Sequence, residues 1–379
     1  MTLDVGMLGY RFMGEAHSNA LARLPMFFPD APEVRRHTLV GRDEAALAEA
    51  ADRLGFEHVE TEWETAVEDV DVLYNLGPNS LHEAPSVAAL DAGVHVLCEK
   101  PLAHTLDAAA RMADAARDSD AVAGCAFNYR FVPAIRHARE LIASGTLGEV
   151  RQVRARYLQD WLADPDDPWA WRLDADVAGS GALGDLGSHA VDLASYLLDD
   201  DVARVSGHLR TFVDERPVEG GDGEAGESRP VTVDDAFSAQ AAFASGATGV
   251  FEASRVATGN KNAHVVEVNG TRGSLRFDLE RLNELEVLRE DGRGFETVLV
   301  TDESDPYVDH WWPPGHVLGW EHTFVHESYE FLSAVAAAEA GETGAESSFS
   351  PSFAEGLAVQ RVLDAVERSD ETGEWVAVG

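Results

Sequence analysis

The feature that most constrains the fold of this chain is a regular alternation of short apolar runs and helical patterns over residues 1–127. The apolar runs are "LDVGMLG", "HTLVG", "VDVLYNLG" and "HVLCEKP", and helical stretches such as "DEAALAEAADRLG" and "TLDAAARMADAARDS" separate them. Strands that alternate with helices at this spacing form a parallel sheet with helices on both faces. The sequence therefore predicts a doubly wound α/β domain over residues 1–127.

From residue 128 onward the pattern changes to longer alternating strands. The stretches "EVRQVRARYLQ", "AFSAQAAFASGATGVFEASRV" and "HVVEVNGTRGSLRFD" alternate apolar and polar residues over most of their length. This alternation predicts a second α/β domain over residues 128–379, with a large open and mainly antiparallel sheet. Within it, the Gly- and acid-rich stretch "DERPVEGGDGEAGESRP" predicts a mobile loop.

The charge of the chain is extreme and evenly spread. Acidic residues number 68 against 29 basic ones, which gives a net charge of −39. Only Lys100 and Lys261 are lysines. A dispersed acidic surface is tolerated where salt screens repulsion within a few ångströms, so we expect adaptation to very high salt. Nucleic-acid binding is disfavoured, because the sequence shows no basic patch that could contact phosphates.

The two cysteines and the hydropathy pattern indicate a cellular location. Cys98 and Cys125 have no C-x-x-C spacing and suit a reducing interior. Asp4 and Gly6 interrupt any early apolar stretch, so no signal peptide is expected, and no run of about 18 apolar residues predicts a membrane span. We expect a cytoplasmic protein without membrane partners.

The first apolar run leads into a glycine-containing turn, "VGMLGYRFMGEAHSNAL". Gly6, Gly9 and Gly14 fit a strand, a tight turn and a helix whose N-terminus favours an anion. The dinucleotide fingerprint G-x-G-x-x-G wants a second glycine where this chain has Arg11. Arg11 is either a plain surface residue or a guanidinium near cofactor phosphates.

The end of the second predicted strand carries information on the cofactor. NAD-binding folds commonly place an acidic side chain there to hold the ribose 2′-hydroxyl. In "TLVGRD" that position falls on Gly41, and Arg42 follows. A small residue followed by arginine leaves room for a 2′-phosphate and neutralises it, which favours NADP, with NAD still possible. A shift by one residue would instead bring Asp43 into play.

Two further strand ends carry polar motifs. In "LGPNSLH", Asn79 and His82 either line the nicotinamide side of a cleft or cap the following helix. In "CEKP", a chain that has nearly eliminated lysine keeps Lys100 at the carboxyl end of a core strand, where ligands bind in such sheets. Glu99 can tune the charge of Lys100, although a chance survivor among two lysines remains the alternative.

The strongest local signal is "GSGALGDLGSHAVDLASYL". Glycines lead into a helix whose Asp185, His189 and Asp192 lie four and seven residues apart, hence on one helical face. A histidine beside a carboxylate is the usual general base near neutral pH. The alternatives are an ordinary i,i+4 ion pair and a metal site, but no further ligands have suitable spacing.

Together, "GMLGYRFMG", "GPNSLH", "CEKP" and "GALGDLGSHAVDL" resemble the Gfo/Idh/MocA family of oxidoreductases, which includes glucose–fructose oxidoreductase and inositol dehydrogenase. The resemblance covers essentially the whole chain, and "AFNYR", "RYLQDW" and "DPWAWR" are most similar to the branch that acts on anhydro-sugars. It implies an N-terminal Rossmann domain, a C-terminal α/β domain with an open sheet, and homodimers or homotetramers associated through that sheet. Arg11 is the departure from the family pattern.

The resemblance also implies roles for individual residues. Lys100, Asp185 and His189 would be the catalytic group. Cofactor contacts would come from Gly9, Arg11, Phe12, Met13, Gly14, Gly41, Arg42, Pro78, Asn79, His82, Glu99 and Lys100. Substrate contacts would come from Lys100, Arg130, Tyr157, Gln159, Asp160, Trp161, Trp171, Arg172, Asp185, His189 and His322. The alternative for the tryptophans is that they are core residues.

These residues predict an NAD(P)-dependent dehydrogenase that oxidises a secondary hydroxyl of a sugar, anhydro-sugar or inositol. His189, oriented by Asp185, would accept the hydroxyl proton, and Lys100 would stabilise the developing alkoxide. Which of Lys100 and His189 takes the proton stays open. Two other functions also stay open: an NAD-dependent glycosidase of the same superfold, and a non-catalytic NADP sensor.

Overall fold

The alternating pattern of residues 1–127 folds into a parallel sheet in the computed structural model, which describes residues 2–218, 227–344 and 348–379. Its strands follow the order β3-β2-β1-β4-β5-β6, and every neighbouring pair is parallel. The strands are β1 (Thr2–Leu8), β2 (Glu33–Val40), β3 (His58–Glu60), β4 (Val72–Asn75), β5 (His95–Cys98) and β6 (Ala123–Cys125). This order is that of the Rossmann fold, and the strand order reverses between β1 and β4.

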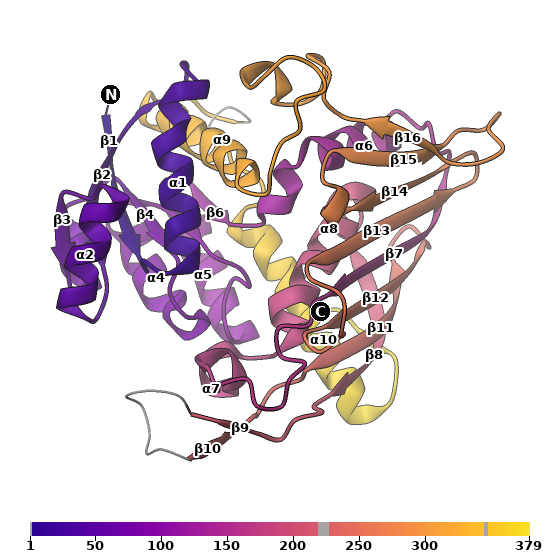
Figure 1. The fold of residues 1–379 in the computed structure, drawn as a ribbon, viewed down its shortest axis with the longest axis horizontal. Helices are drawn as coiled ribbons and strands as arrows, with labels where there is room; N and C mark the ends of the chain where they lie inside the picture. The colour runs from indigo at the N-terminus through magenta and orange to yellow at the C-terminus, as the bar shows by residue number, and fades with distance from the viewer. Residues whose placement is uncertain (1, 219–226, 345–347) are drawn as a thin grey trace. The chain divides into compact units, whose positions relative to one another are not determined.

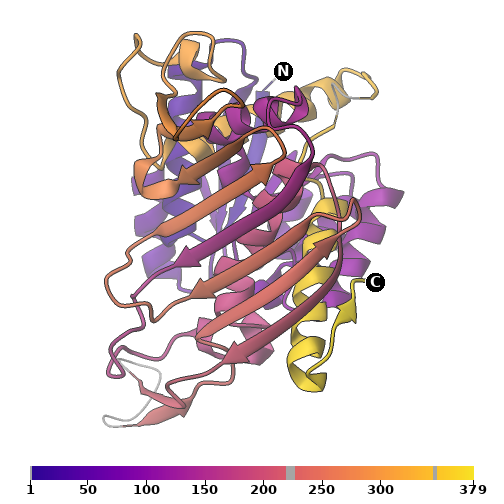
Figure 2. The ribbon, with the colours of Figure 1, turned by 90° about the vertical axis from the view of Figure 1, so that its right-hand side faces the viewer.

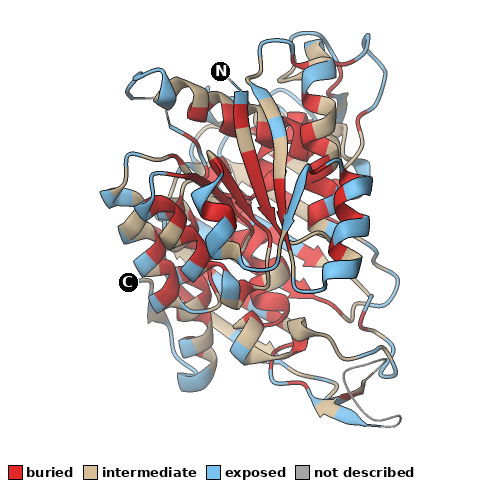
Figure 3. Ribbon diagram, turned by 90° about the vertical axis from the view of Figure 1, so that its left-hand side faces the viewer, coloured by how far each residue is buried: buried red, intermediate tan, exposed pale blue. Residues whose placement is uncertain are grey.

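The helices of this region follow their strands as the sequence predicts (Figure 1). They are α1 (Phe12–Phe27), α2 (Glu44–Leu54), α3 (Trp63–Glu68), α4 (Glu83–Asp91) and α5 (Leu106–Asp118). The short elements β3 and α3 were not expected, because the residues between 55 and 70 show little apolar periodicity. β4 and β5 are buried along their whole length (Figure 3). This agrees with the mainly apolar sequence of these strands, because helices cover both faces of a parallel sheet.

The chain divides into two compact units, and the division differs from the expected boundary at residues 127 and 128. The first unit contains residues 1–131 and 319–357, and the second contains residues 132–318 and 358–379. The late segment joins the first unit because α9 (His322–Glu339) packs its aromatic side chains there. The ring of Phe324 lies 5.1 Å from that of His17, and the ring of Phe331 lies 6.0 Å from that of Tyr74.

The second unit is built on a nine-stranded sheet (Figure 2) with the order β16-β15-β14-β13-β7-β12-β11-β8-β17. Its strands are β7 (Val150–Leu158), β8 (Val202–Arg210), β11 (Ala236–Phe243), β12 (Thr248–Ser254), β13 (Ala263–Gly270), β14 (Ser274–Asp278), β15 (Glu284–Leu288), β16 (Glu296–Leu299) and β17 (Val376–Ala377). Neighbours are antiparallel except β12 and β7, which pair in parallel. The sheet is therefore mixed and mainly antiparallel, because β7 is inserted between two hairpins.

Helices cover one face of this sheet and leave the other to solvent. The unit contains α6 (Pro133–Ala143), α7 (Ala175–Ala178) and α8 (Ser188–Leu198), and α10 (Phe353–Thr372) supplies residues from 358 onward. α8 packs on β7, β12 and β13. Along β7, Val153, Ala155 and Tyr157 are buried, whereas Arg154 and Arg156 between them are exposed. The strand alternation thus separates a covered face from a polar one.

The Gly- and acid-rich stretch is described only at its two ends. These ends form a ribbon of β9 (Glu215–Pro217) and β10 (Ser228–Pro230), which pair antiparallel. The mobile loop predicted from the sequence includes residues 219–226, which lie outside the described residues.

Candidate active site

The turn after β1 leaves the N-terminus of α1 without a side-chain cap. Gly9 has φ +106°, and its N–H donates to the carbonyl of Val40 at 3.1 Å. A Cβ at Gly9 would lie 2.9 Å from the carbonyl oxygen of Leu76, which follows β4. Arg11 is the N-cap of α1 and makes no side-chain hydrogen bond to it. The first N–H groups of the helix therefore remain available to an anion at the point where the strand order reverses.

Gly14 and Arg11 show how this turn works without the second glycine of the fingerprint. A Cβ at Gly14 would lie 2.4 Å from the carbonyl oxygen of Gly9, so the first helical turn packs directly on the strand exit. The side chain of Arg11 is exposed and does not fill the turn. Phe12 is also exposed, and its ring stacks on that of Trp320 at 5.5 Å. The turn fits a bound pyrophosphate, and Met13 beside it is partly buried.

The end of β2 has no room for the acidic side chain of an NAD fingerprint. A Cβ at Gly41 would lie 2.3 Å from Cε1 of Tyr10. Arg42 is exposed. The carboxylate of Asp43 accepts hydrogen bonds from the backbone N–H groups of Ala45 and Ala46, both at 3.1 Å. Asp43 is thus the N-cap of α2, which removes the support for a shift of one residue.

His82 does not cap the helix that follows it, and its place beside a nicotinamide stays a prediction. Its ring is fully buried, and it makes no side-chain cap to α4. Nδ1 lies 3.0 Å from the carbonyl of Pro101, and Nε2 lies 3.0 Å from the carbonyl of Gly77. Burial lowers the pKa of His82 although these carbonyls oppose the shift. His82 joins the loops that follow β4 and β5, and Asn79, also buried, lies in the first of these loops.

Lys100 follows β5, and a buried carboxylate holds its backbone. Oε2 of Glu99 accepts the N–H of Lys100 at 3.0 Å, and Oε1 lies 3.1 Å from Nε2 of His17. Burial by itself would raise the pKa of Glu99, but the hydrogen bond with His17 and the charges of His17 and Lys100 outweigh it and lower the pKa. The carboxylate of Glu99 thus bonds to His17 and to the backbone of Lys100 inside the first unit, and its contact with a cofactor stays a prediction.

Two predicted substrate contacts are used inside the first unit. Arg130 is buried, and its Nη1 donates to Ser350 at 3.0 Å and to Glu355 at 2.5 Å. Nδ1 of His322 accepts the N–H of Gly319 at 3.0 Å, and burial lowers the pKa of this histidine. Arg130 therefore anchors the segment before α10, and His322 shapes the start of α9. Sequence patterns could not reveal these partners, which lie far away along the chain in the case of Arg130.

The helix that carries Asp185 and His189 begins with a π turn rather than as a plain α-helix. Leu183–Gly187 form the π-helix η4, which continues into α8. The carboxylate of Asp234 accepts the N–H groups of Gly181 at 2.7 Å and Leu183 at 2.9 Å, so it caps this entry. Single π turns inside helices occur frequently at functional sites. Asp185 thus lies in the π turn, while His189 and the buried Asp192 lie in α8.

An aromatic pair on the covered face of the sheet supports His189. The rings of Tyr157 on β7 and His264 on β13 stack at 4.6 Å, and these two residues pair directly across the strands. The ring of His189 lies 5.8 Å from that of Tyr157 and 6.3 Å from that of His264. Burial lowers the pKa of His264 to about 3, so this ring is neutral. Sequence reasoning missed His264, because only the register of β7 and β13 brings it to this place.

A polar group lies beside this aromatic pair. The hydroxyl of Tyr157 donates to Oδ1 of Asn262 at 2.6 Å, and Nε2 of Gln159 donates to the same oxygen at 2.8 Å. Asp160 forms an ion pair with Lys261 at 2.8 Å. Asn262 was also missed, because it lies in the loop before β13 and carries no motif. Two predicted substrate residues, Tyr157 and Gln159, are thus brought together.

The predicted aromatic residues of the next loop are not core residues. Trp161 is 42% exposed, and Trp171 is partly buried with the guanidinium of Arg172 at 4.4 Å from its ring. Arg255, which the sequence analysis missed, contacts both parts of this loop. The guanidinium of Arg255 is 5.8 Å from the ring of Trp161 and donates to the carbonyl of Arg172 at 3.2 Å. Trp161, Trp171 and Arg172 are thus available for stacking and polar contacts with a sugar.

Two further properties concern the whole described chain. Among the residues that the structure describes, no group of three or more His, Cys, Asp or Glu side chains could hold a metal ion. Within the same residues, no helix has the length and apolar character needed to cross a membrane. The predicted catalytic residues are divided, with Lys100 in the first unit and Asp185 and His189 in the second.

Comparisons with known proteins agree with this geometry. Residues 3–127 match the model of an oxidoreductase family with an NAD-binding Rossmann fold, and residues 135–276 match the GFO/IDH/MocA C-terminal domain. The chain is 41% identical over 392 residues to levoglucosan dehydrogenase from Pseudarthrobacter phenanthrenivorans, covering 99% of this chain and 98% of the relative. A solved structure of levoglucosan dehydrogenase in complex with NADH and levoglucosan is 39% identical, with a TM-score of 0.92 over 100% of both chains.

A second relative differs in its cofactor. The D-xylose 1-dehydrogenase [NADP(+)] of Haloarcula marismortui is 32% identical over 182 residues, which cover 47% of this chain and 51% of the relative. The first family model matches the residues of the parallel sheet, and the second matches residues of the nine-stranded sheet. Together the two models match most of the chain. This chain therefore belongs to the Gfo/Idh/MocA family of oxidoreductases, with a nicotinamide-binding Rossmann domain and homologues that are sugar dehydrogenases.

Proposed function

We propose that this protein is an NAD(P)-dependent dehydrogenase that oxidises a secondary hydroxyl of a sugar, anhydro-sugar or inositol. The observation that carries the proposal is the turn at Gly9, which opens α1 without a side-chain cap at the switch point of the sheet. Residues 1–127 would bind the dinucleotide, and residues 128–379 would supply the substrate and association surfaces. An anhydro-sugar is the first substrate to test, because the relative that matches over its whole length is a levoglucosan dehydrogenase.

In this proposal the chemistry is divided between the two parts of the chain. A bound nicotinamide would take the hydride from the substrate carbon. His189 accepts the proton of the reacting hydroxyl, and Asp185 orients the imidazole and stabilises its charged form. Lys100 donates a hydrogen bond to the same oxygen and stabilises the developing negative charge. The neutral ring of His264, stacked on Tyr157, supports the aromatic wall beside His189.

Substrate recognition would rest on side chains of the second unit. Gln159 with its partner Asn262 supplies an amide pair for hydroxyl groups, and Trp161 and Trp171 supply faces for the apolar side of a sugar ring. Arg172 adds a charged donor near Trp171. Arg130 and His322 are omitted from the proposed contacts, because each has a structural partner in the first unit.

For the cofactor, we propose a preference for NADP over NAD. Tyr10 occupies the space where an acidic side chain at position 41 would lie, so no carboxylate is available at that position for a ribose 2′-hydroxyl. The exposed guanidinium of Arg42 can neutralise a 2′-phosphate. Relatives of both kinds exist, since one is named for NADP(+) and another is solved with NADH.

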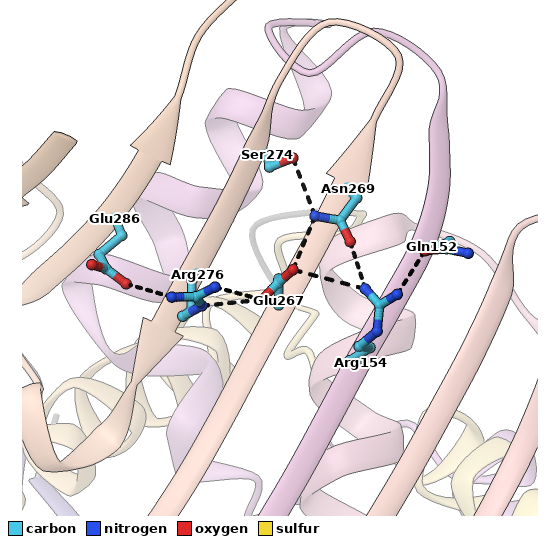
Figure 4. Close-up of polar contacts among 7 residues, drawn as sticks. All are labelled: Gln152, Arg154, Glu267, Asn269, Ser274, Arg276 and Glu286. Atoms are coloured by element: carbon cyan, nitrogen blue, oxygen red, sulfur yellow. Dashed lines mark hydrogen bonds and ion pairs between the residues drawn. The ribbon is translucent and has the colours of Figure 1, made fainter. Parts of the chain in front are cut away.

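We also propose a homodimer or homotetramer that associates through the exposed face of the nine-stranded sheet. Figure 4 shows a row of polar side chains across β7, β13, β14 and β15 on this face. Arg276 binds Glu267 at 2.9 Å, and Nη1 of Arg154 donates to Asn269 at 2.7 Å. Light scattering in about 2 M KCl should give at least twice the chain mass, and a monomer would contradict the proposal.

The extreme charge supports two proposals about the setting. With a net charge of −39, we propose that the enzyme works at very high salt, where repulsion between acidic side chains is screened. The buried Cys98 and Cys125 suit a reducing cytoplasm.

The test is a substrate panel followed by absorbance at 340 nm. Aldoses, inositols and anhydro-sugars are assayed with NAD and NADP in multimolar KCl, and at least one should give net reduced cofactor. Lys100→Ala should lower kcat more than about a hundredfold while cofactor binding, measured by fluorescence, is retained. Glycoside cleavage without net reduced cofactor would indicate the glycosidase, and binding without any turnover would indicate the sensor.

A further inference from the structure

Two arginines of the second unit are buried almost completely, and they offer a matched comparison. Arg216 is 0% exposed and Arg255 is 1% exposed. Arg216 donates to the carbonyls of Asp164 at 2.7 Å and Leu162 at 2.6 Å. Arg255 donates to the carbonyls of Arg172 at 3.2 Å and Asp234 at 2.9 Å. A buried guanidinium is costly, so each side chain needs a reason beyond these neutral acceptors.

The difference between the two lies in the charges around them. Burial lowers the pKa of Arg255, and the carboxylates of Asp185, Asp234 and Asp235 oppose this shift, Asp185 most strongly. The hydrogen bonds that the structure gives to Arg216 end on backbone carbonyls of the loop before η3 (Trp171–Leu173). Arg255 is therefore placed beside the predicted partner of His189, whereas Arg216 braces a loop.

The turn that leads to Asp185 is built around Arg255. A Cβ at Gly181 would lie 2.6 Å from Nη2 of Arg255 and 1.8 Å from the carbonyl oxygen of Asp234. The same Asp234 caps the turn through the N–H groups of Gly181 and Leu183. Gly181 is thus required so that the buried guanidinium of Arg255 can approach the start of the helix. The positive charge of Arg255 is therefore held in place at the start of the helix that carries Asp185.

We propose that Arg255 is a positioning residue of the acid–base machinery, whose positive charge keeps Asp185 ionised to orient His189 and keeps His189 unprotonated near neutral pH, so that His189 can accept the proton of the substrate hydroxyl. This inference rests on the proposed function. A nearby opposite charge lowers the pKa of a carboxyl group. Because Arg255 is buried and Asp185 is partly buried, salt screens their interaction less than that between the surface charges of this acidic protein.

Several other titratable groups face this network. Arg172 and Asp235 act on Arg255, and the rings of Tyr157 and His264 lie near that of His189. Asp192 follows three residues after His189 on α8 and is buried. Glu367 of α10 interacts with Asp234, Asp364 and Glu371, and burial together with these charges raises its pKa to about 7. A pH profile must therefore be recorded in a Glu367→Gln background, so that this group does not contribute to it.

The sign of the expected effect follows from the charge. Removing a positive charge raises the pKa of every coupled group nearby, so both Asp185 and His189 should bind protons more tightly in Arg255→Met. The acid limb of kcat/KM should then move to higher pH by about one unit, and turnover near pH 6 should fall about tenfold. Arg255→Lys keeps the charge, and its acid limb should stay within a few tenths of a unit of the parent.

The experiment compares Arg255→Met, Arg255→Gln and Arg255→Lys with Arg216→Met as the matched control. It records kcat/KM against pH, melting temperature, and the titration of His189 by NMR in histidine-labelled protein, with the signal assigned by His189→Asn. The neutral Arg255 variants should raise the pKa of His189, whereas Arg216→Met should lower only the melting temperature. Arg255→Gln keeps hydrogen-bond donors, so it serves if Arg255→Met does not fold.

The outcomes separate this inference from the proposed function. An unmoved His189 titration in both neutral variants, or an equal shift in Arg216→Met, would overturn the role of Arg255. Full activity of His189→Asn would instead overturn the proposed catalytic pair. In that case the NMR titration still shows whether Arg255 controls the charge of the Asp185 and His189 pair.

Discussion

Two turns rich in glycine lead into helices in this protein, and their N-terminal ends are treated in opposite ways. At the first, Gly9 takes a positive φ and α1 begins without a side-chain cap, next to the exposed Arg11. At the second, the absence of a side chain at Gly181 leaves room for the guanidinium of Arg255, and the carboxylate of Asp234 lies where an anion would bind. Both are glycine turns before helices, but only the first leaves its helix terminus open.

This difference teaches that glycine spacing alone does not identify an anion site. A helix N-terminus attracts negative charge, and the protein can supply that charge from its own chain or leave it to a ligand. In the second unit the internal carboxylate of Asp234 closes the terminus and fixes the turn that carries Asp185. In the first unit the open terminus at α1 is where a dinucleotide phosphate would bind.

The largest effect is expected at the closed turn. In Gly181→Ala, the new Cβ has to displace the carbonyl of Asp234 and the guanidinium of Arg255. Because backbone and a buried charge cannot both move cheaply, we expect a loss of about 4 kcal/mol or more, or failure to fold. Chemical denaturation in high salt measures this. Gly294→Ala is the control, since its Cβ would meet nothing within 4 Å, and equal losses in both variants would refute the packing argument.

Salt should affect the exposed acidic surface and the buried charges around Arg255 differently. Repulsion among exposed acidic side chains weakens as the Debye length falls from about 10 Å at 0.1 M to about 3 Å at 1 M. Activity and melting temperature should therefore rise steeply between about 0.1 M and 2 M KCl, by roughly 3 kcal/mol or about 6–12 °C. A melting temperature that stays flat over the titration would contradict the halophilic proposal.

The salt effect also has an internal control in the buried charges. Most of the gain should appear by about 1 M KCl if screening dominates, and a continued rise would instead indicate salting-out of apolar surface. The stability difference between the wild type and Arg255→Met should change little with salt, because both Arg255 and its partner Asp234 are buried.

At the open turn, substitution should affect the cofactor more than the fold. Gly9→Ala places a side chain at φ +106° and within 2.9 Å of a carbonyl oxygen, which costs about 1–3 kcal/mol of backbone strain. We expect a loss of at least about tenfold in NADPH affinity together with a moderate drop in melting temperature. Cofactor fluorescence titration measures the affinity, and an unchanged dissociation constant would remove this turn from the binding site.

The smallest effect concerns the choice between the two cofactors. Arg42→Ala should raise KM for NADP by about tenfold and barely change KM for NAD, because it removes a charge beside the proposed 2′-phosphate. Arg117→Ala is the control, since this exposed arginine pairs with Asp114 on α5, away from the end of β2. Equal changes for NADP and NAD would contradict the proposed preference.

The fold could be predicted from the sequence in segments where the spacing of apolar residues is typical of one kind of secondary structure. The apolar runs of β1, β4 and β5 alternate with helical patterns, and this alternation predicted a parallel sheet. The boundary of the first unit could not be predicted, because α9 begins 197 residues after the end of β6 and joins that unit only through tertiary contacts. The parallel pairing of β7 with β12 was hidden for the same reason.

The candidate site was predictable only as far as local motifs extend. "CEKP" and "GDLGSHAVD" identified Lys100, Asp185 and His189 as candidates, because these types of residue are unusual at such places. His264, Asn262 and Arg255 carry no motif and reach the site through strand register or burial. The hydrogen bond of Arg130 with Glu355 could not be predicted, because the two residues lie 225 positions apart in the sequence.

The most direct test of the account is to follow hydrogen from substrate to cofactor. The sugar with the highest turnover in the panel is prepared with deuterium on its carbons, and the cofactor is analysed by mass spectrometry and NMR after one turnover. The account predicts reduced NADP carrying one deuterium at C4 of the nicotinamide and a substrate oxidised to a ketone or lactone. Sugar cleavage with no net reduced cofactor, or reduced cofactor without deuterium, would contradict a hydride transfer from a sugar hydroxyl carbon.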